Sequence, residues 1–434
     1  MKVEVEVISN EIIKPSSPTP DHLRHYQLSF LDQLCPKTYN PLVFFYELNG
    51  DQYQDDYSNI SNKIKSSLSE VLTLFYPLAG QVKNDRFIDC NDQGICYSVA
   101  RVNSPCHLSD AMKNPLPIEL CKYLPFEIQQ LTEFSLGVQL NVFEHGGIAI
   151  GLCVSHQIAD ALSCVRFVKA WVAITRGEGD QVAHPEFVSG KLFPLTDDPG
   201  FDATALVTKK LVTKRFVFDA STIEKVRTEP FKDHAEEKRP SRFEALSAFI
   251  FNRFAAATSD EYSSVSDNGY TMVLPVNLRP KHDPPLPEHS FGNLSRCGVA
   301  ILSSAGEEYG HDAARRIREG IRKVDMDYIR KVQQGEDPHL NLLREYATKV
   351  IMKGGQHVSL CFTSLCRFPL YEADFGWGEP AWVSSASMSF TNLVAFMDTK
   401  SNNGIEAYIA LKEEDMAKLE ADEEFLKAVS QVGR

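Results

Sequence analysis

Between Ile148 and Arg176, the spacing of apolar residues changes from that of a strand to that of a helix. Large aliphatic residues alternate with small ones as far as Ser155, which predicts a β-strand. From Ala161 onward, apolar residues recur every three or four positions, which predicts an amphipathic α-helix. His156 lies where the strand ends, on the face that carries the large aliphatic side chains. We therefore expect the chain to be organised around this strand, turn and helix.

The position of His156 suits a general base. A strand end can hold an imidazole rigidly, and the ordinary pKa of histidine lies close to neutrality. The alternative is a buried histidine whose hydrogen bonds are satisfied by the backbone. Asp160 precedes the predicted helix and is expected to be its N-cap. The HxxxD spacing alone does not decide between the two roles of His156.

Length and charge limit the possible architecture and partners. A chain of 434 residues exceeds what one hydrophobic core usually supports, so two domains are expected. The net charge of −13 includes no concentrated basic stripe, which argues against nucleic acid as a partner. No heptad repeat is visible, and a monomer is expected.

Targeting signals and cysteine pairs are missing from the sequence. The N-terminus lacks the layout of a signal peptide, and no segment approaches the ~18 apolar residues of a membrane span. A cytoplasmic protein without membrane attachment is therefore expected. The ten cysteines include no CxxC pair and no Cys/His spacing typical of zinc sites, so no metal is expected and the thiols are expected to be reduced.

The order of helical and strand patterns predicts an α/β fold with two mixed sheets, each covered by helices on one face. A stretch rich in glycine, proline and acidic residues, 181–208, is expected to be a crossover loop. It would join an N-terminal domain of residues 1–180 to a C-terminal domain of residues 209–434.

Several local elements follow from turn residues and periodicity. Hairpins are predicted at 86–102, where NDQG separates two alternating runs, and at 393–411, where NNG forms the turn. Two helices are expected within 307–352, and one closing helix at 412–429.

Motifs of several enzyme classes are absent from the sequence. There is no GxSxG elbow, GxGxxG loop, phosphate-binding loop or HExxH helix. Cys153 cannot pair with His156 as a nucleophile, because residues three apart on a strand point to opposite faces. A lone base without a neighbouring nucleophile suits direct transfer between two bound substrates.

HQIAD at 156–160 and DFGWG at 374–378 together resemble the motifs of plant BAHD acyl-CoA-dependent acyltransferases. LSFLDQ, FYPLAG, VNLRP and SFGNL extend the resemblance over the whole chain. KPSSPTP, DCNDQG, DPPLP and EEDM are most similar to the branch that contains vinorine synthase and salutaridinol acetyltransferase. That branch mainly acetylates hydroxyls of alkaloids and other specialised metabolites.

The resemblance implies a chloramphenicol-acetyltransferase-like fold of two similar-sized domains with a channel between them. Acyl-CoA, expected to be acetyl-CoA, would enter from one end, and an alkaloid or terpenoid alcohol from the other. His156 would take the hydroxyl proton as the oxygen attacks the thioester, with no bound cofactor. A longer acyl donor, N-acylation, a sugar, phenolic or amine acceptor, and a non-catalytic small-molecule binder remain open alternatives.

The resemblance also assigns roles to individual residues. Asp160 would pair with Arg279 and shape the loop after His156. Asp374 is a candidate second catalytic group, although its place in a glycine-rich turn favours a structural role. The turn itself would be formed by Gly376, Trp377 and Gly378.

Contacts to coenzyme A are expected at four residues, namely Ser241, Arg242, Ser364 and Arg367. The sequence departs from the family pattern at three positions. Ala161 replaces a glycine, Gln81 replaces an arginine, and Leu365 replaces a tryptophan whose N–H could reach an oxyanion. Leucine has no donor, so Thr363, a backbone N–H or water would have to supply one.

Overall fold

The computed structural model describes residues 3–48, 57–103, 107–200, 211–232, 234, 236–262, 269–302, 309–401 and 403–430. Its contacts divide the chain into two compact units, each built around one large mixed sheet. The first unit comprises Met1–Val207, Leu286–Leu294 and Arg367–Ser389, and the second comprises Thr208–Pro285, Ser295–Cys366 and Phe390–Arg434. The predicted α/β class with two mixed sheets is confirmed.

The predicted strand 148–155 is an interior strand of the first unit, where all eight of its residues are buried. The sheet has the order β1-β6-β7-β8-β3-β13, and all its neighbours are antiparallel except β6 and β7. Its strands are β1 (Val5–Ile13), β6 (Ile95–Val102), β7 (Leu136–Phe143), β8 (Ile148–Ser155), β3 (Tyr39–Tyr46) and β13 (Trp382–Ser384). The burial of β8 explains its continuous run of apolar and small residues.

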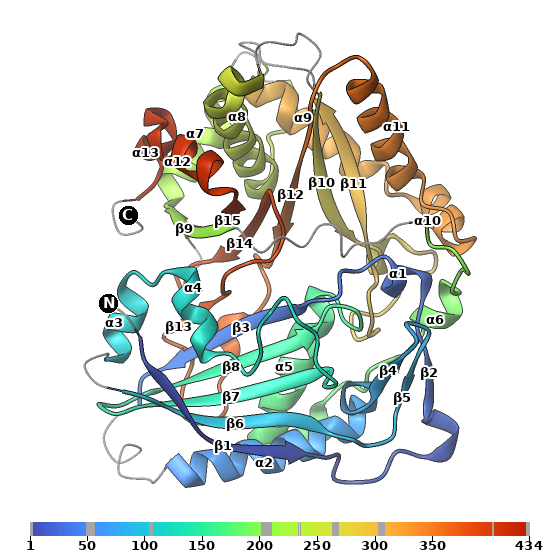
Figure 1. Ribbon diagram of the computed structural model, residues 1–434, viewed down its shortest axis with the longest axis vertical. Coiled ribbons are helices and arrows are strands. Elements are labelled where there is room, and N and C mark those ends of the chain that lie inside the picture. Colours follow the sequence, from blue (N-terminus) through green and yellow to red (C-terminus); the bar gives the residue numbers. More distant parts are fainter. Residues whose placement is uncertain are drawn as a thin grey trace. The chain divides into compact units, whose positions relative to one another are not determined.

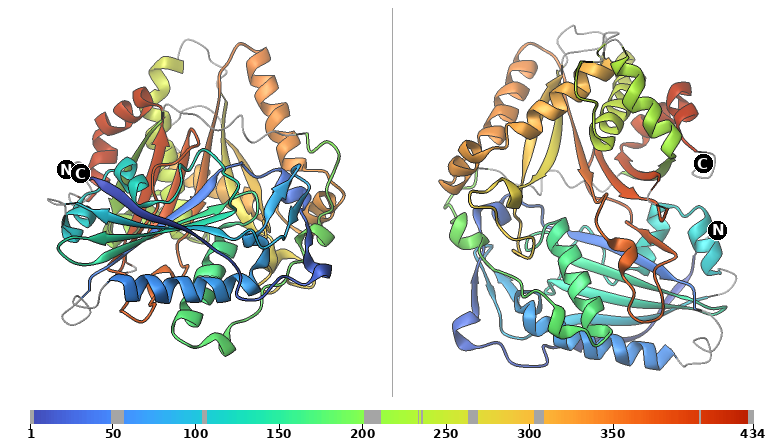
Figure 2. Two further views of the ribbon diagram at one scale, coloured as in Figure 1. Left: turned by 60° about the horizontal axis from the view of Figure 1, so that its bottom comes forward. Right: turned by 180° about the vertical axis from the view of Figure 1, so that it is seen from behind.

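Helices cover both faces of this sheet (Figures 1 and 2). One face is covered by α2 (Tyr57–Leu74) and α5 (Ala161–Thr175), which are joined by a 3.0 Å hydrogen bond from the Trp171 indole to Ser67 Oγ. On the other face, Ala149 and Cys153 of β8 share a core cluster with Tyr123. Tyr123 belongs to a run of short helices, α3 (Leu108–Lys113), α4 (Pro117–Leu120) and η4 (Cys121–Tyr123).

The hairpin predicted at 86–102 is wrong. Its first strand is β5 (Phe87–Asp89), which pairs with β2 (His25–Gln27) and β4 (Gln81–Lys83) in a separate three-stranded sheet, whereas β6 pairs with β1 and β7. The smaller elements of the first unit are η1 (Asp21–Leu23), α1 (Phe30–Gln33), η3 (Tyr76–Ala79), η5 (Gly179–Gln181), α6 (Ser189–Leu192) and η9 (Leu370–Glu372). The NDQG stretch therefore connects two sheets.

The sheet of the second unit has the order β11-β10-β12-β14-β15-β9, with β12 parallel to both of its neighbours. Its strands are β9 (Val212–Phe218), β10 (Gly269–Asn277), β11 (Ser295–Leu302), β12 (His357–Ser364), β14 (Leu393–Asp398) and β15 (Ile405–Leu411). The antiparallel pairing of β14 with β15 confirms the hairpin predicted at 393–411, although Asn402 of its turn lies outside the described residues.

One face of this sheet packs against helices that contribute to its core. The elements between and after the strands are α7 (Ala220–Thr228), η7 (Glu229–Phe231), α8 (Arg242–Tyr262), η8 (Arg279–Lys281), α9 (Tyr309–Arg322), α10 (Met326–Gln333), α11 (Pro338–Met352), α12 (Glu413–Ala421) and α13 (Glu423–Ala428). Two helices were expected within 307–352, and the structure has three, α9, α10 and α11. One closing helix was expected at 412–429, and the structure has two, α12 and α13. Asp325, Asp337 and Asp422 cap new helices within these stretches.

The two units differ from the contiguous domains predicted at 1–180 and 209–434. Residues 286–294 and 367–389, which carries DFGWG, belong to the first unit. The second segment contains β13, which pairs with β3, and the first is bonded to the start of α5. Non-local hydrogen bonds thus override sequence proximity. Of the crossover loop at 181–208, residues 201–208 lie outside the described part.

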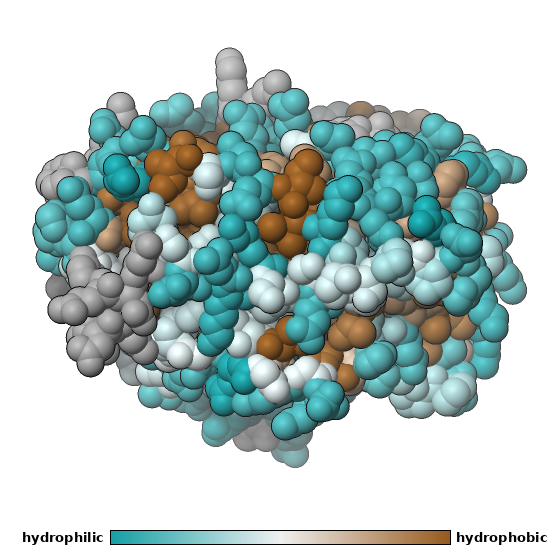
Figure 3. Space-filling view, turned by 90° about the horizontal axis from the view of Figure 1, so that it is seen from below, coloured by the Kyte–Doolittle hydropathy of each residue, from teal (hydrophilic) through white to brown (hydrophobic). Residues whose placement is uncertain are grey.

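Two findings concern the hydropathy of the described helices and the described cysteines. No described helix is long and apolar enough to cross a membrane. None of the nine cysteines within the described residues forms a disulfide with another of them. Figure 3 views the molecule from the side on which α2 lies in Figure 1, and hydrophilic residues there surround separate apolar patches.

Replacement of Gly151 tests the close packing of β8 against the backbone of Tyr123. A Cβ at this position would overlap the carbonyl oxygen of Tyr123 and lie 2.8 Å from its carbonyl carbon. We expect Gly151→Ala to destabilise the first unit by about 3 kcal/mol, lowering the thermal unfolding midpoint by roughly 6 to 12 °C. Gly179→Ala is the control, since its Cβ would meet only ordinary contacts at 3.4 and 3.6 Å. Equal midpoints for the two variants would contradict this packing.

Candidate active site

His156 begins the turn that links β8 to α5, as predicted. Its backbone N–H donates to the Thr38 carbonyl at 2.8 Å, which continues the pairing of β8 with β3 beyond the strand end. Ile158 and Ala159 donate to the Ser155 carbonyl at 3.1 and 3.3 Å, which closes the turn. The backbone at His156 is therefore held by the sheet as well as by the turn.

The two ring nitrogens of His156 are in different surroundings. Nδ1 is buried and has no hydrogen-bond partner of good geometry. Burial lowers the pKa of His156 below its ordinary value of 6.5, and this effect is opposed by the carbonyls of residues 156 and 159, the Asp160 charge and the Asn293 side chain. The imidazole is therefore neutral at pH 7. With Nδ1 enclosed, Nε2 is the nitrogen available to a substrate.

Asp160 is the N-cap of α5, as predicted, and also holds a distant segment. Its Oδ1 accepts a hydrogen bond from Ser163 N at 2.9 Å, and its Oδ2 accepts one from Leu294 N at 3.0 Å. The hydroxyl of Ser163 bonds to both the carbonyl and the N–H of Gly292, at 2.9 and 3.1 Å. The start of α5 thereby fixes residues 292–294 beside the turn of His156.

Asn293, in the middle of this fixed segment, was not predicted as a site residue. Its amide nitrogen donates to the His156 carbonyl at 2.9 Å and to Asp32 Oδ1 at 2.8 Å. In the sequence, Asn293 is part of the SFGNL motif of the family resemblance. An asparagine directly after a glycine, at the end of a proline-rich loop, is the sequence signal that could have marked it.

Asp374 makes the contacts of a turn-stabilising residue. Its Oδ1 accepts from the N–H groups of Gly376 and Gly378 at 2.7 and 2.9 Å, and its Oδ2 lies 3.5 Å from the Arg176 guanidinium. Both glycines have positive φ, at 102° and 106°, which side-chain-bearing residues rarely adopt. The predicted turn of DFGWG is therefore present.

The aromatic residues of this motif anchor it to the first unit. Trp377 lies edge-on to Tyr46 with ring centroids 6.1 Å apart, and Phe375 contacts Trp171 at 4.6 Å. The Tyr46 hydroxyl donates to the Ala373 carbonyl at 2.7 Å. DFGWG thus packs where Tyr46 ends β3.

The lengths of β3 and α5 give the approximate separation of Asp374 from His156. In the pairing of β3 with β8, Tyr39 lies opposite Ser155 at the His156 end and Tyr46 lies opposite Ile148 at the other. Eight strand residues span roughly 23 Å. The fifteen residues of α5, between the cap Asp160 and the Asp374 partner Arg176, span about 22 Å. The expectation of a catalytic role for Asp374 is corrected, because the carboxylate lies too far from the imidazole.

Three of the predicted coenzyme A residues, Ser241, Arg242 and Ser364, lie near the C-terminal ends of β12 and β14 in the second unit. The Ser241 N–H donates to the Glu244 carboxylate at 2.7 Å, and the Glu244 N–H donates to Ser241 Oγ at 3.1 Å, which forms a capping box at the start of α8. Arg242 donates to Asp398 Oδ1 and the Gly404 carbonyl, both at 3.2 Å. Asp398 ends β14, which runs parallel to β12, the strand that Ser364 ends. A helix N-terminus beside an arginine favours an anion.

The predicted oxyanion donor, Thr363, lies near the end of β12, and Leu365 directly follows this strand. Thr363 is half-buried and points to the opposite face from Phe362, a core residue. Leu365 N donates to the Phe396 carbonyl at 2.8 Å, so this backbone donor is already used. Arg367 is exposed, with φ of 67°, and belongs to the first unit.

Arg279 is buried in the second unit, with 1% of its surface exposed. Its guanidinium donates to Asn277 Oδ1 at 3.2 Å. The pairing with Asp160 stays a prediction.

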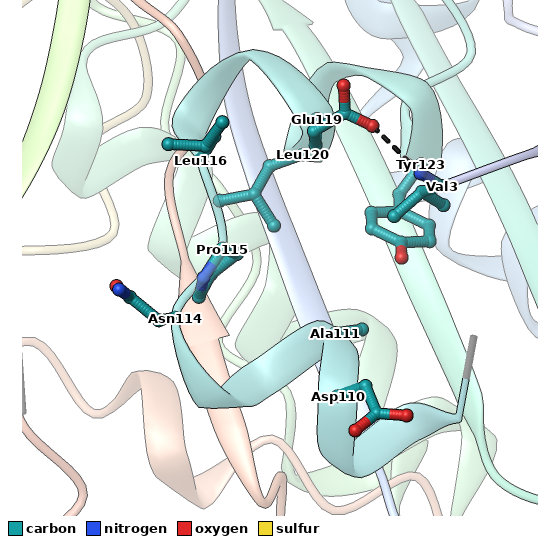
Figure 4. A pocket seen from close by; sticks show the side chains of 9 residues that line it. All are labelled: Val3, Asp110, Ala111, Asn114, Pro115, Leu116, Glu119, Leu120 and Tyr123. Atoms are coloured by element: carbon teal, nitrogen blue, oxygen red, sulfur yellow. Dashed lines mark hydrogen bonds between the residues drawn. The ribbon is translucent and has the colours of Figure 1, made fainter. Parts of the chain in front are cut away.

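Two further features of the described residues, a pocket and a group of metal-ligating side chains, do not form the expected binding site. Figure 4 shows a pocket of ≈ 60 Å³ between α3, α4 and Val3, which has room for about two water molecules and is too small for an alkaloid or terpenoid. One group within the described residues has metal-ligand spacing, His234, Glu237 and His311. The two imidazoles stack at 3.8 Å and 11°, so their lone pairs run parallel and do not converge on one ion.

Comparisons with known proteins cover nearly the whole chain. The model of the Transferase family matches residues 3–426. Limonoid 21-O-acetyltransferase of Melia azedarach is 38% identical over 97% of each chain, and stemmadenine O-acetyltransferase of Catharanthus roseus is 34% identical over 97% of each. The structure of vinorine synthase has a TM-score of 0.83 and 32% identity, over 99% of this chain and 100% of that one. TRI101 of F. graminearum, complexed with coenzyme A and deoxynivalenol, has a TM-score of 0.74 at 17% identity, over 94% and 100%.

Substitutions of Asp374 separate a structural role from acid/base chemistry. Asp374→Ala leaves two glycine N–H groups without their acceptor and should destabilise the protein by about 1 to 3 kcal/mol. Asp374→Asn keeps an acceptor and should be milder. We expect kcat per folded molecule to stay within about threefold of wild type in both, measured alongside thermal unfolding. A loss of kcat in the asparagine variant of about 100-fold, with stability intact, would restore the catalytic role.

Proposed function

Because the chain belongs to the BAHD family of acyl-CoA-dependent acyltransferases, we propose that it acetylates a hydroxyl of a plant specialised metabolite, a terpenoid or an alkaloid. The proposal rests on one observation above all. A neutral histidine is held at a strand end with one ring nitrogen enclosed and the other available. The names of the relatives, which acetylate limonoids and stemmadenine, support acetyl-CoA as donor and a polycyclic alcohol as acceptor.

The reaction proceeds by direct transfer. Nε2 of His156 accepts the proton of the acceptor hydroxyl while its oxygen forms a bond to the thioester carbonyl carbon. A free alcohol is too weakly acidic to ionise first, so the two events are concerted. The tetrahedral oxyanion then collapses, the bond between carbon and sulfur breaks, and the thiolate leaves with the proton from His156.

The remaining groups have supporting roles. The start of α8, with Ser241 and Arg242, holds a phosphate of the acyl-CoA, and Ser364 lies at the end of the neighbouring strand β12. Thr363 is the side-chain candidate for an oxyanion donor, because Leu365 has none. The observed hydrogen bonds of Asp160 shape the turn of His156.

Replacing His156 tests the reaction. We expect His156→Ala to lower kcat by about 10² to 10⁴, the usual contribution of general-base catalysis, while calorimetry still detects binding of coenzyme A. Turnover is followed by thiol release from acetyl-CoA and longer acyl-CoAs with a panel of limonoid, other terpenoid, alkaloid, phenolic, sugar and amine acceptors. His22→Ala, at an exposed histidine, is the matched control.

The panel also distinguishes the alternatives. A preferred longer acyl donor or an amine acceptor would change the substrate assignment and keep the mechanism. A wild-type protein that binds coenzyme A and turns over no pair would support a non-catalytic binder. A variant without His156 that keeps wild-type turnover would refute the assignment of the base.

The acidity of His156 predicts the pH profile. The base must be neutral, so kcat/KM should fall as the pH drops through the pKa of His156, and burial places that midpoint below 6.5. The Asp160 charge raises the pKa of His156, so Asp160→Asn should move the midpoint further down. Rates measured from pH 4.5 to 8.5 test this. A wild-type midpoint above 7 would be incompatible with the enclosed ring.

A further inference from the structure

A second carboxylate, Asp32 of the LSFLDQ segment, is buried behind the turn of His156. It has 1% of its surface exposed, and burial raises its pKa to about 6, so it is ionised at pH 7. Its Oδ2 accepts from the N–H and the hydroxyl of Ser29, both at 2.7 Å, and its Oδ1 accepts from Asn293 at 2.8 Å. Within the described residues no cation forms an ion pair with it. A buried charge without a counterion is costly, which points to a role beyond stability.

The Asp32 carboxylate fixes which way the Asn293 amide faces. The amide nitrogen donates one hydrogen to Asp32 and the other to the His156 carbonyl. A flipped amide would place its oxygen against a carboxylate and a carbonyl, so only the observed orientation is compatible. Asn293 Oδ1 is then buried without a partner, as is His156 Nδ1, and the Asn293 side chain favours the protonated imidazole.

We propose that Asp32 is a positioning residue, which acts through Asn293 to hold His156 in the tautomer with hydrogen on Nδ1 and a free lone pair on Nε2. The inference rests on the proposed role of His156 as the base. When Nε2 takes the hydroxyl proton, the Asn293 side chain, polarised by the Asp32 charge, favours the imidazolium that forms, alongside the carbonyls of residues 156 and 159. Asp160 cannot substitute here, because both of its oxygens accept backbone N–H groups.

Asp32→Asn is the central variant. A carboxylate accepts on both sides, whereas an amide can accept either from Ser29 or from Asn293 and turns a donor toward the other. Asn293→Ala removes the intermediary, and the double variant tests whether the two act in series. Ser29→Ala is the matched control, because it removes the hydroxyl bond to the same carboxylate and leaves the contact with Asn293.

The first readout is the tautomer of His156 by ¹⁵N NMR of histidine-labelled protein without substrate, with the signal assigned by its loss in His156→Ala. We expect one tautomer, protonated at Nδ1, in wild type and Ser29→Ala, and a mixture in Asp32→Asn and Asn293→Ala. Because no turnover is needed, this result stands even if the acceptor or the proposed reaction is wrong.

The second readout is kinetic. We expect Asp32→Asn to lower kcat by about 10- to 100-fold, the scale on which groups behind an active residue act, with KM for acyl-CoA within about twofold. The double variant should be no slower than Asn293→Ala. Tyr26 also faces the carboxylate, so Tyr26→Phe is included and should leave the tautomer unchanged. The proposal would be overturned if the tautomer were unchanged in Asp32→Asn. It would also be overturned if the kcat losses of the two single variants multiplied in the double variant, or if Ser29→Ala had the same effect as Asp32→Asn.

Discussion

The Asp160 carboxylate is the contact on which the candidate site depends. One oxygen starts α5, and the other holds Leu294, from a segment more than a hundred residues further along the chain. Without this contact, the turn of His156 would be tied to the distant loop mainly through the bonds of Ser163 and Asn293. A single buried side chain thus joins a strand end, a helix start and a distant loop, and the imidazole takes its position from all three.

The surroundings of His156 are well suited to a base that must be neutral before it acts. Burial lowers the pKa, so a proton from solvent seldom occupies the ring at pH 7. Hydrogen-bond acceptors and the Asp160 charge nevertheless surround it, and they stabilise the imidazolium when a substrate proton arrives. The two tendencies act at different stages of the reaction, which reconciles a weakly basic resting state with effective proton transfer.

Sequence reasoning was accurate where the signal was local and failed where distant residues decide. The strand 148–155, the cap Asp160 and the hairpin 393–411 follow from alternation, a side-chain acceptor and turn residues, all within a few positions. The pairing of β5 with β2 and β4 could not be read in the same way, because turn residues do not specify a partner strand. The role of Asn293 could not be predicted either, because it depends on a fold that brings this residue next to Asp32 and His156. Asp374, a candidate second catalytic group by family analogy, is separated from His156 by the full length of β3 and α5.

The interleaving of the two units has a consequence for synthesis on the ribosome. The first unit needs residues 286–294 and 367–389, so it is incomplete until translation has passed residue 389 of 434. Until then β3 is paired with β8 on one side and lacks β13 on the other, whereas the turn of His156 can gain its distant support once residues 292–294 have been made. A product that ends before residue 292 therefore carries the motif HQIAD without the distant loop that supports the turn of His156.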